Sequence, residues 1–331
     1  MQVTTSEKWN NHTAITEFIL LGFGAANELQ ILLFLVFAVI YIFTMTGNIL
    51  IVILVVSDQH LHTPMYYFLG NLSFLEVCYS SNILPKMLGR FLTGDKTISV
   101  SGCFTQLFCF GCLICVECYL LSLMSFDRYV AICKPLHYAT IMNGRIILYL
   151  LVGSWICAVS ISFLIVYRVS QLSFCGPDEI DHFFCDFSPL LQLSCSDISH
   201  VKLLALIFGS INILPPFILT ITSYVCIITA ILRISSTTGR QKAFATCSSH
   251  LIVVTLFYGT LTIVYILPNT STLGELKKVF SVPYAVLTPM VNPLIYSLRN
   301  KEVKESLKRL WIDSSFRGDI KRSNPLLLRR G

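Results

Sequence analysis

Charged residues are scarce in this sequence. Only 13% of its 331 residues are charged, whereas soluble domains carry about a quarter. With a mean hydropathy of +0.71, this deficit excludes an ordinary soluble domain and indicates a bilayer as the solvent. The sequence also lacks low-complexity tracts. Its two halves are not related by a repeat, a feature that a transporter would often show. Residues 1–28 show no pattern of a cleaved signal peptide, so we expect the first apolar run to act as the insertion signal.

Long apolar runs take the place of the missing charge. A membrane helix needs roughly 20 mostly apolar residues. Seven runs approach or exceed that length: Ile31–Val56, Met65–Leu84, Gln106–Phe126, Ile146–Tyr167, Val201–Leu232, Thr246–Leu267 and Val279–Leu298. The sequence therefore predicts an all-α membrane protein built as a seven-transmembrane helix bundle. We expect residues 1–30 to form an extracellular segment, 31–298 the seven-span domain and 299–331 a cytoplasmic tail.

Basic residues and glycosylation motifs give the orientation. With seven spans the termini lie on opposite sides, and the basic segment after the last span favours a cytoplasmic C-terminus. That placement fits an anionic lipid surface better than nucleic acid. The motif Asn11-His12-Thr13 then lies outside, as N-glycosylation requires, and so does Asn269-Thr270-Ser271, whose use stays open. We predict an extracellular N-terminus with a glycan at Asn11.

The most informative stretch is Met124–Tyr138, which ends the third run with Asp127-Arg128-Tyr129. A charged pair at the end of a membrane helix marks a functional site unless it is only the edge of a span. Pro135 disfavours helical backbone at the residue before it, so the helix should end near Lys134. The ordered acid–arginine–tyrosine string favours a functional role over a simple edge.

Four of the thirteen cysteines fall on the oxidising, outer side: Cys103, Cys175, Cys185 and Cys195. An even number at such positions predicts disulfides. Four cysteines allow three connectivities, and the residues alone do not choose among them. A bridge from Cys103 to the long outer loop would hold that loop across the mouth of the bundle.

Two sequence patterns contain residue types that often bind metals, but we do not interpret either as a metal site. The run Cys109-x-x-Cys112-x-x-Cys115-x-x-Cys118 has iron–sulfur spacing. On a helix, however, the four sulfurs would spread over roughly 13–14 Å and turn about 60° at each step, so they cannot converge on one cluster. The second pattern, His182-Phe183-Phe184-Cys185-Asp186, loses its thiolate if Cys185 is in a disulfide. We therefore predict no metal centre at either place.

Several motifs together resemble the rhodopsin-like (class A) G-protein-coupled receptors and, within them, the olfactory receptors. They are Gly47-Asn48, Leu61–Leu69 (Leu-His-Thr-Pro-Met-Tyr-Tyr-Phe-Leu), Met124–Tyr138, Ser223-Tyr224, Lys242–Leu251 and Pro289–Asn300. The resemblance covers nearly the whole chain. Small departures are Ser125-Phe126 in place of the family's usual Ala-Tyr, and Glu76 where Asp is commoner.

This resemblance implies an odorant-activated receptor, not an enzyme, in the plasma membrane and specifically the ciliary membrane of olfactory neurons. Its implied partners are a small-molecule odorant, a stimulatory G protein of the olfactory type that raises cyclic AMP, and membrane lipid, with no nucleic acid. It also implies the pairs Cys103–Cys185 and Cys175–Cys195. The implied activation switch, in which Arg128 is held by Asp127 or nearby polar groups and then released, comprises Asp127, Arg128, Tyr129, Tyr224, Asn292, Pro293 and Tyr296.

Two acids lie deep within predicted spans, Glu76 and Glu117. Buried carboxylates must be protonated, paired or bound to a cation. By analogy with the family, Asn48 and Asn292 lie at the same level, so the four side chains could bind an allosteric sodium ion. Protonated carboxyls hydrogen-bonded to neighbours are the alternative. We expect no other cofactor.

A ligand cavity is expected in the outer halves of the third, fifth and sixth spans. Small ligands favour apolar cavities with few polar groups. The candidate residues are Phe110, Gly111, Ile114, Cys115, Phe208, Asn212, Tyr258, Leu261, Thr262 and Tyr265, with Ala285 from the seventh span. Each could instead be ordinary helix packing. No strong fixed charge is among them, so we expect a neutral or weakly polar volatile such as an alcohol, aldehyde, ketone or ester.

Three other functions are weighed against this one. A non-olfactory rhodopsin-like receptor for a small apolar ligand is the nearest alternative, and tissue expression separates the two. A channel or transporter should show charged rings, helix-breaking pairs or related halves. A membrane enzyme should bring His/Asp or Ser/His residues together on one membrane face, and no such arrangement stands out in the sequence.

Overall fold

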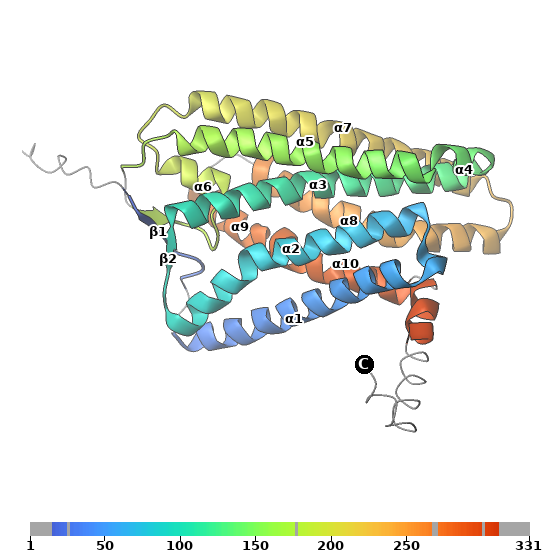
Figure 1. The fold of residues 1–331 in the computed structure, drawn as a ribbon, viewed down its shortest axis with the longest axis horizontal. Helices are drawn as coiled ribbons and strands as arrows, with labels where there is room; N and C mark the ends of the chain where they lie inside the picture. The colour runs from blue at the N-terminus through green and yellow to red at the C-terminus, as the bar shows by residue number, and fades with distance from the viewer. Residues whose placement is uncertain (1–14, 25–26, 176–177, 267–270, 300–301, 311–331) are drawn as a thin grey trace, which may run out of the picture.

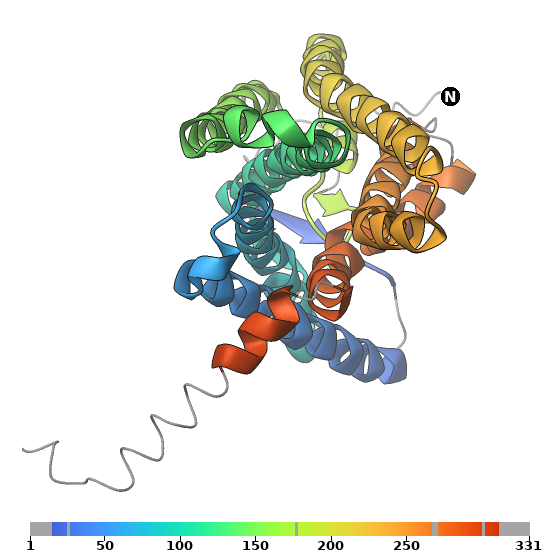
Figure 2. The ribbon, with the colours of Figure 1, turned by 90° about the vertical axis from the view of Figure 1, so that its right-hand side faces the viewer.

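The structure is a computed structural model that describes residues 15–24, 27–175, 178–266, 271–299 and 302–310. Its long helices run side by side in one bundle (Figures 1 and 2). They are α1 Asn27–Ser57, α2 Pro64–Thr93, α3 Val100–Cys133, α5 Gly144–Ser170, α7 Ser199–Leu232, α8 Thr237–Ile266, and a last span made of α9 Ser271–Val282, the π-helical turn η3 Pro283–Leu287 and α10 Thr288–Arg299. This arrangement confirms the predicted seven-helix fold.

Short elements join the long helices on the two sides. The inner side has the turns η1 Gln59–Leu61 and η2 Pro135–His137 and the helix α4 Tyr138–Ile141. The outer side has α6 Phe187–Gln192. A further helix over residues 302–310 follows α10. It lies at the opposite end of the bundle from the strands β1 and β2 (Figure 1).

Local capping, rather than the end of the apolar run, decides where the helices stop. The second span continues past Leu84 to Thr93, and Gly94 then takes a left-handed conformation with φ 72° that ends it. The third span ends at Cys133 with Lys134 as its cap, as the proline at 135 predicts. Ser99 begins that same helix, accepting a hydrogen bond from the Gly102 amide.

Apolarity alone identifies only some of the spans. Within the described residues, four helices are long and apolar enough to cross a membrane: Leu29–Ser57 of α1, and α3, α5 and α7. The second span contains Glu76, Lys86 and Arg90, so its average hydropathy is lower although it packs inside the same bundle. Such polar residues are tolerated where they face protein instead of lipid.

A small sheet, which the sequence did not predict, covers the outer end of the bundle. Strand β1 Glu17–Leu20 lies between β2 Thr97–Ser99, to which it is antiparallel, and β3 Glu179–Ile180, to which it is parallel. Phe18 and Leu20 point into an apolar cluster that also holds Ile180. Disulfides join Cys103 to Cys185 and Cys175 to Cys195, the two pairs that the family resemblance implies. Strand β1 is therefore the central strand of a small cap over this end of the bundle.

We expect Phe18→Ala to destabilise this cap, because the Phe18 side chain is 0% exposed. Removing a buried phenylalanine ring costs about 3–5 kcal/mol. Thermal unfolding of the protein in nanodiscs should show a clearly lower apparent Tm for Phe18→Ala, whereas Glu17→Ala, at the neighbouring exposed position, should resemble the wild type. Equal stability of the two variants would contradict the buried role of β1.

Candidate functional site

At the inner end of α3, Asp127 is the centre of a small hydrogen-bonded network of polar side chains. One carboxylate oxygen of Asp127 accepts hydrogen bonds from the Arg128 Nε at 3.0 Å and Nη2 at 2.7 Å. The other oxygen accepts one from the Tyr138 hydroxyl at 2.7 Å. Asp127 is 0% and Arg128 20% exposed. Burial and the bond to Asp127 raise the pKa of the Tyr138 hydroxyl, so it stays protonated and keeps donating. Arg128 is thus held by its neighbouring acid.

A second tie joins α7 to α8 close to this group. The Tyr224 hydroxyl lies 2.6 Å from Nδ1 of His250, and the two rings stack with centroids 5.9 Å apart. Both side chains are buried, and Tyr224 packs in a cluster with Cys247 and the half-buried Tyr129 of α3. The sequence interpretation used His250 only as part of the string Lys242–Leu251 and missed this contact. The Tyr296 side chain lies outside the described residues.

Midway through the bundle, two polar contacts join the first two helices to the last span. The Asn48 amide donates to the carbonyls of Thr44 at 2.9 Å and Pro289 at 3.0 Å. The Asn292 amide donates to the Glu76 carboxyl. Gly47 allows the close approach, since a Cβ there would lie 3.1 Å from the Cβ of Pro293. Both residues of the motif Gly47-Asn48 therefore serve to pack α1 against the last span.

Oxygen atoms at this level remain available to a cation. Asn48 Oδ1, Glu76 Oε2, Glu117 Oε1 and Asn292 Oδ1 are buried and have no hydrogen-bond partner among the described residues. Glu117 lies close enough to Glu76 for the two carboxylates to repel each other when charged. Hard cations bind carboxylate and amide oxygens. The donor set therefore fits a sodium ion in its chemistry.

Five of the predicted ligand residues belong to the main buried core of the bundle. They are Phe110 and Ile114 of α3, Tyr258 and Leu261 of α8, and Ala285, and the same core extends as far as Val303. The Phe110 ring contacts three other rings, those of Tyr79, Phe184 and Tyr284, with centroids 5.4, 4.8 and 6.0 Å away. An aromatic layer thus closes the region from the outer side.

Of the remaining predicted ligand residues, Cys115 packs against the same core, whereas Gly111 and Asn212 contact other helices. Gly111 faces α5, where a Cβ would lie 3.4 Å from the Ser162 hydroxyl. Asn212 is fully buried, accepts a hydrogen bond from the Tyr119 hydroxyl and donates one to the Phe208 carbonyl at 2.7 Å. Cys115 and Phe208 are half-buried and Thr262 is exposed, while the Tyr265 side chain lies outside the described residues.

The outer loop between α5 and α7 is fixed over the aromatic layer. Lys278 of α9 forms an ion pair with Asp181, and the His182 Nε2 lies 3.3 Å from the Ser281 hydroxyl. The Cys185 amide donates to the Gln106 side chain at 2.8 Å. Because Cys185 is bonded to Cys103, it offers no thiolate to a metal. The sequence did not reveal these ties, which join residues about a hundred positions apart.

His182 lies outside the spans and is buried against the rings of Phe183 and Phe184. Burial, reinforced by the positive charge of Lys278, lowers the pKa of His182 to about 3. The imidazole therefore stays neutral at physiological pH and can share a hydrogen bond with Ser281.

Comparison with known proteins gives a consistent picture. A family model described as "Olfactory receptor" matches residues 37–314. Human olfactory receptor 10A7 is 50% identical over 299 residues, which cover 90% of this chain and 95% of the relative. Rat olfactory receptor 1f45 is 46% identical over 300 residues, covering 91% and 96%. The crystal structure of squid rhodopsin superimposes with a TM-score of 0.62 at 15% identity over 87% of each chain, and so shares the fold.

Acid should weaken the outer cap through His182. An unfolded-chain histidine binds its proton near pH 6.5, whereas folded His182 does so only near pH 3. Between these values the unfolded state holds more protons. The stabilisation is therefore fully present above about pH 6.5 and is lost as the pH falls towards 3, by at most about 1.4 kcal/mol per pH unit.

The expected result is an apparent Tm that falls more steeply below about pH 6.5 for the wild-type receptor than for His182→Gln. The matched control is His60→Gln, because the His60 side chain is 76% exposed, and this variant should keep the slope of the wild type. Parallel curves for wild type and His182→Gln would contradict the buried neutral state.

Proposed function

Since the chain belongs to the olfactory receptor family, we propose that it binds a neutral or weakly polar volatile inside the bundle and activates a stimulatory G protein that raises cyclic AMP. It is a multi-pass membrane receptor with a rhodopsin-like fold and not an enzyme. We place it in the ciliary membrane of olfactory neurons.

One observation carries this proposal: Arg128 is held by Asp127, whose other carboxylate oxygen accepts a hydrogen bond from Tyr138, and Tyr224 is separately bonded to His250 nearby. Together these contacts define one arrangement of α3, α7 and α8. A second arrangement, with Arg128 released, would present a cation to a partner. A ligand shifts such an equilibrium only by its difference in affinity for the two states.

The candidate ligand residues lie on α3 and α8, the two helices whose inner ends carry these contacts. Phe110 and Ile114 stand on α3, and Tyr258 and Leu261 on α8. The Tyr258 hydroxyl donates to the Cys118 carbonyl of α3 at 3.3 Å, and its ring contacts Phe217 of α7 at 5.0 Å. A molecule lodged between α3 and α8 would change these contacts. Movement of α8 would then strain the Tyr224–His250 bond further along the same helix.

The G protein would bind at the same inner end. Leu136, in the turn after α3, is 93% exposed and lies outside the long helices that would face lipid. It lies outside the bundle and a few residues from Arg128 and Tyr138. We assign Leu136 to the contact with the G protein, where burial of an apolar side chain would contribute to affinity.

A sodium ion is proposed for the resting receptor. Asn48, Glu76, Glu117 and Asn292 would hold it through the oxygens that lack other partners. When bound, the ion would neutralise the buried carboxylates. It would thereby favour the arrangement in which α2, α3 and α10 stay close together.

The direct test is a panel of volatile alcohols, aldehydes, ketones and esters, applied to cells that express the receptor with a stimulatory G protein. A rise in cyclic AMP above cells with empty vector supports the proposal, and the same compounds should leave a surface-expressed but uncoupled variant silent. A response confined to charged amines would contradict the ligand class.

Arg128→Ala should serve as that uncoupled variant. Removing the guanidinium leaves no cation to release towards the G protein. We therefore expect agonist-driven cyclic AMP to fall at least tenfold while surface expression persists. A tenfold fall corresponds to the loss of one charge-assisted contact worth ~1.4 kcal/mol or more. The control Arg145→Gln removes an exposed cation at the start of α5. Unchanged output in Arg128→Ala would remove the proposed switch.

Replacing sodium by N-methylglucamine should lower the apparent Tm of the agonist-free wild-type receptor, because a ligand of the folded state stabilises it. Glu76→Gln should show a smaller change on the same exchange, since one charged donor is lost. Glu179→Gln, at an exposed position of β3, is the control. If Glu76→Gln kept the full sodium dependence, the proposed ion site would be wrong.

A further inference from the structure

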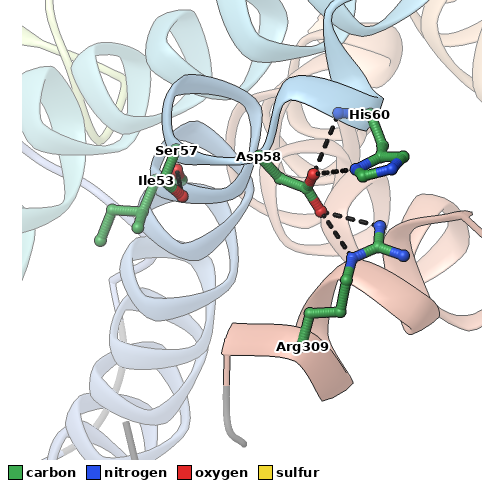
Figure 3. Close-up of polar contacts among 5 residues, drawn as sticks. All are labelled: Ile53, Ser57, Asp58, His60 and Arg309. Carbon is green, nitrogen blue, oxygen red and sulfur yellow. Dashed lines mark hydrogen bonds and ion pairs between the residues drawn. The ribbon is translucent and has the colours of Figure 1, made fainter. Parts of the chain in front are cut away.

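One contact at the inner surface has no part in the switch, the ligand cluster or the sodium site. Asp58 lies between α1 and η1, and its carboxylate is shared by two partners (Figure 3). One oxygen accepts from the His60 amide and lies near the His60 Nδ1, both at 3.0 Å. The other accepts from the Arg309 Nε at 3.1 Å and Nη2 at 2.8 Å. The second partner comes from the helix over residues 302–310, which we call the tail helix.

The carboxylate is held in place before Arg309 reaches it. Asp58 is the N-cap of the turn η1, and its bond from the His60 amide fixes the direction of the side chain. The Asp58 side chain is only 14% exposed, against 43% for Arg309. The nearby Ser306 hydroxyl and the Arg309 guanidinium hold the pKa of Asp58 far below its ordinary value, so the group stays charged. A preorganised charged acceptor makes stronger hydrogen bonds than a mobile surface one.

The tail helix also packs against the bundle. Val303 belongs to the main core cluster and Leu307 lies against it, while Lys304, Lys308 and Arg309 are exposed. Arg309 thus sits at the far end of a helix whose first turn is already buried. Figure 2 shows this helix in front of α1, next to the end of α1 that Asp58 follows.

The same helices are therefore joined at two levels. In mid-membrane, Asn48 of α1 bonds to Pro289 and Glu76 of α2 to Asn292. At the inner surface, Asp58 bonds to Arg309, after the chain has left α10. In contrast, the inner end of α8 is tied to α7 through Tyr224 and His250.

We propose that Asp58 and Arg309 form a clamp that positions the tail helix and so sets the fixed half of the surface that receives the G protein. Asp58 is in this sense a positioning residue. The identity of the partner, a G protein, rests on the proposed function, whereas the clamp itself does not. The α1, α2 and α10 helices with the tail helix make up the fixed part, against which α8 moves.

The clamp is tested first without any ligand or signalling. Amide hydrogen exchange of the tail helix is measured on the full-length, agonist-free receptor in nanodiscs. Loss of a charge-assisted bond shifts the docked-to-free ratio by roughly tenfold or more. Asp58→Asn and Arg309→Gln should therefore each speed exchange in residues 302–310 by about that factor. Lys308→Gln, which removes a neighbouring exposed cation without touching Asp58, should not.

The second readout is agonist-free cyclic AMP in cells with excess stimulatory G protein, normalised to surface expression. This cyclic AMP level should fall several-fold in Asp58→Asn and Arg309→Gln. It should fall less in Arg309→Lys, because lysine keeps the charge but loses the forked geometry of arginine. In Lys308→Gln it should stay at the wild-type level. Should Asp58→Asn fail to reach the surface, Arg309→Gln and Arg309→Lys carry the same comparison.

The outcomes separate the clamp from the proposed function. Unchanged exchange in both Asp58→Asn and Arg309→Gln overturns the clamp. Faster exchange with unchanged cyclic AMP overturns its role in positioning the partner surface. A wild-type receptor that gives no cyclic AMP output, either agonist-free or with any volatile of the panel, contradicts the proposed coupling, while its exchange data still decide whether the clamp exists.

Discussion

The structure depends on one constraint: a polar side chain inside a bilayer must find its partner within the protein, because lipid offers none. Each unsatisfied group costs several kcal/mol, so every buried polar side chain restricts how its helix can turn and slide. Asp127, Asn48 and Glu76 are all buried and all bonded to another side chain or carbonyl. The apolar surface brings the helices into the membrane, but these few bonds decide which faces meet.

The polar bonds fall into two sets that join different helices. One set, through Asn48 and Glu76, attaches α1 and α2 to the last span, and the Asp58 bond extends it to the inner surface. The other set, Tyr224 with His250, joins α7 to α8. Between them stands α3, whose Asp127 bonds only to its own neighbour and to Tyr138 of the following short helix. Because few polar bonds join the sets, the two groups of helices can move relative to each other.

The sequence predicts what local chemistry determines and misses what depends on helix rotation. Pro135 located the end of α3 because its effect on the backbone is local, and the apolar runs located the spans to within several residues, although only four of the described helices are apolar enough to be identified by hydropathy alone. Strand β1 was missed because its four residues gain their place from partners far along the chain, in β2 and β3. His250 was missed for a similar reason, since nothing local says that it turns towards α7. The sequence also did not show that Asn212, which stays a predicted ligand contact, bonds to Tyr119 across the α3–α7 interface.

Close packing in the outer half links ligand choice to activation. Phe110 is surrounded by the rings of Tyr79, Phe184 and Tyr284, and Tyr258 is buried against α3. Interiors packed this tightly have discrete arrangements and do not deform continuously. A molecule that enters between Phe110 and Tyr258 must therefore move at least one ring, and the outer loop above is fixed by its disulfide and by Lys278. In the proposed mechanism, the fixed outer loop prevents the ligand from being accommodated on that side. Its volume would then displace α8, the helix that carries His250.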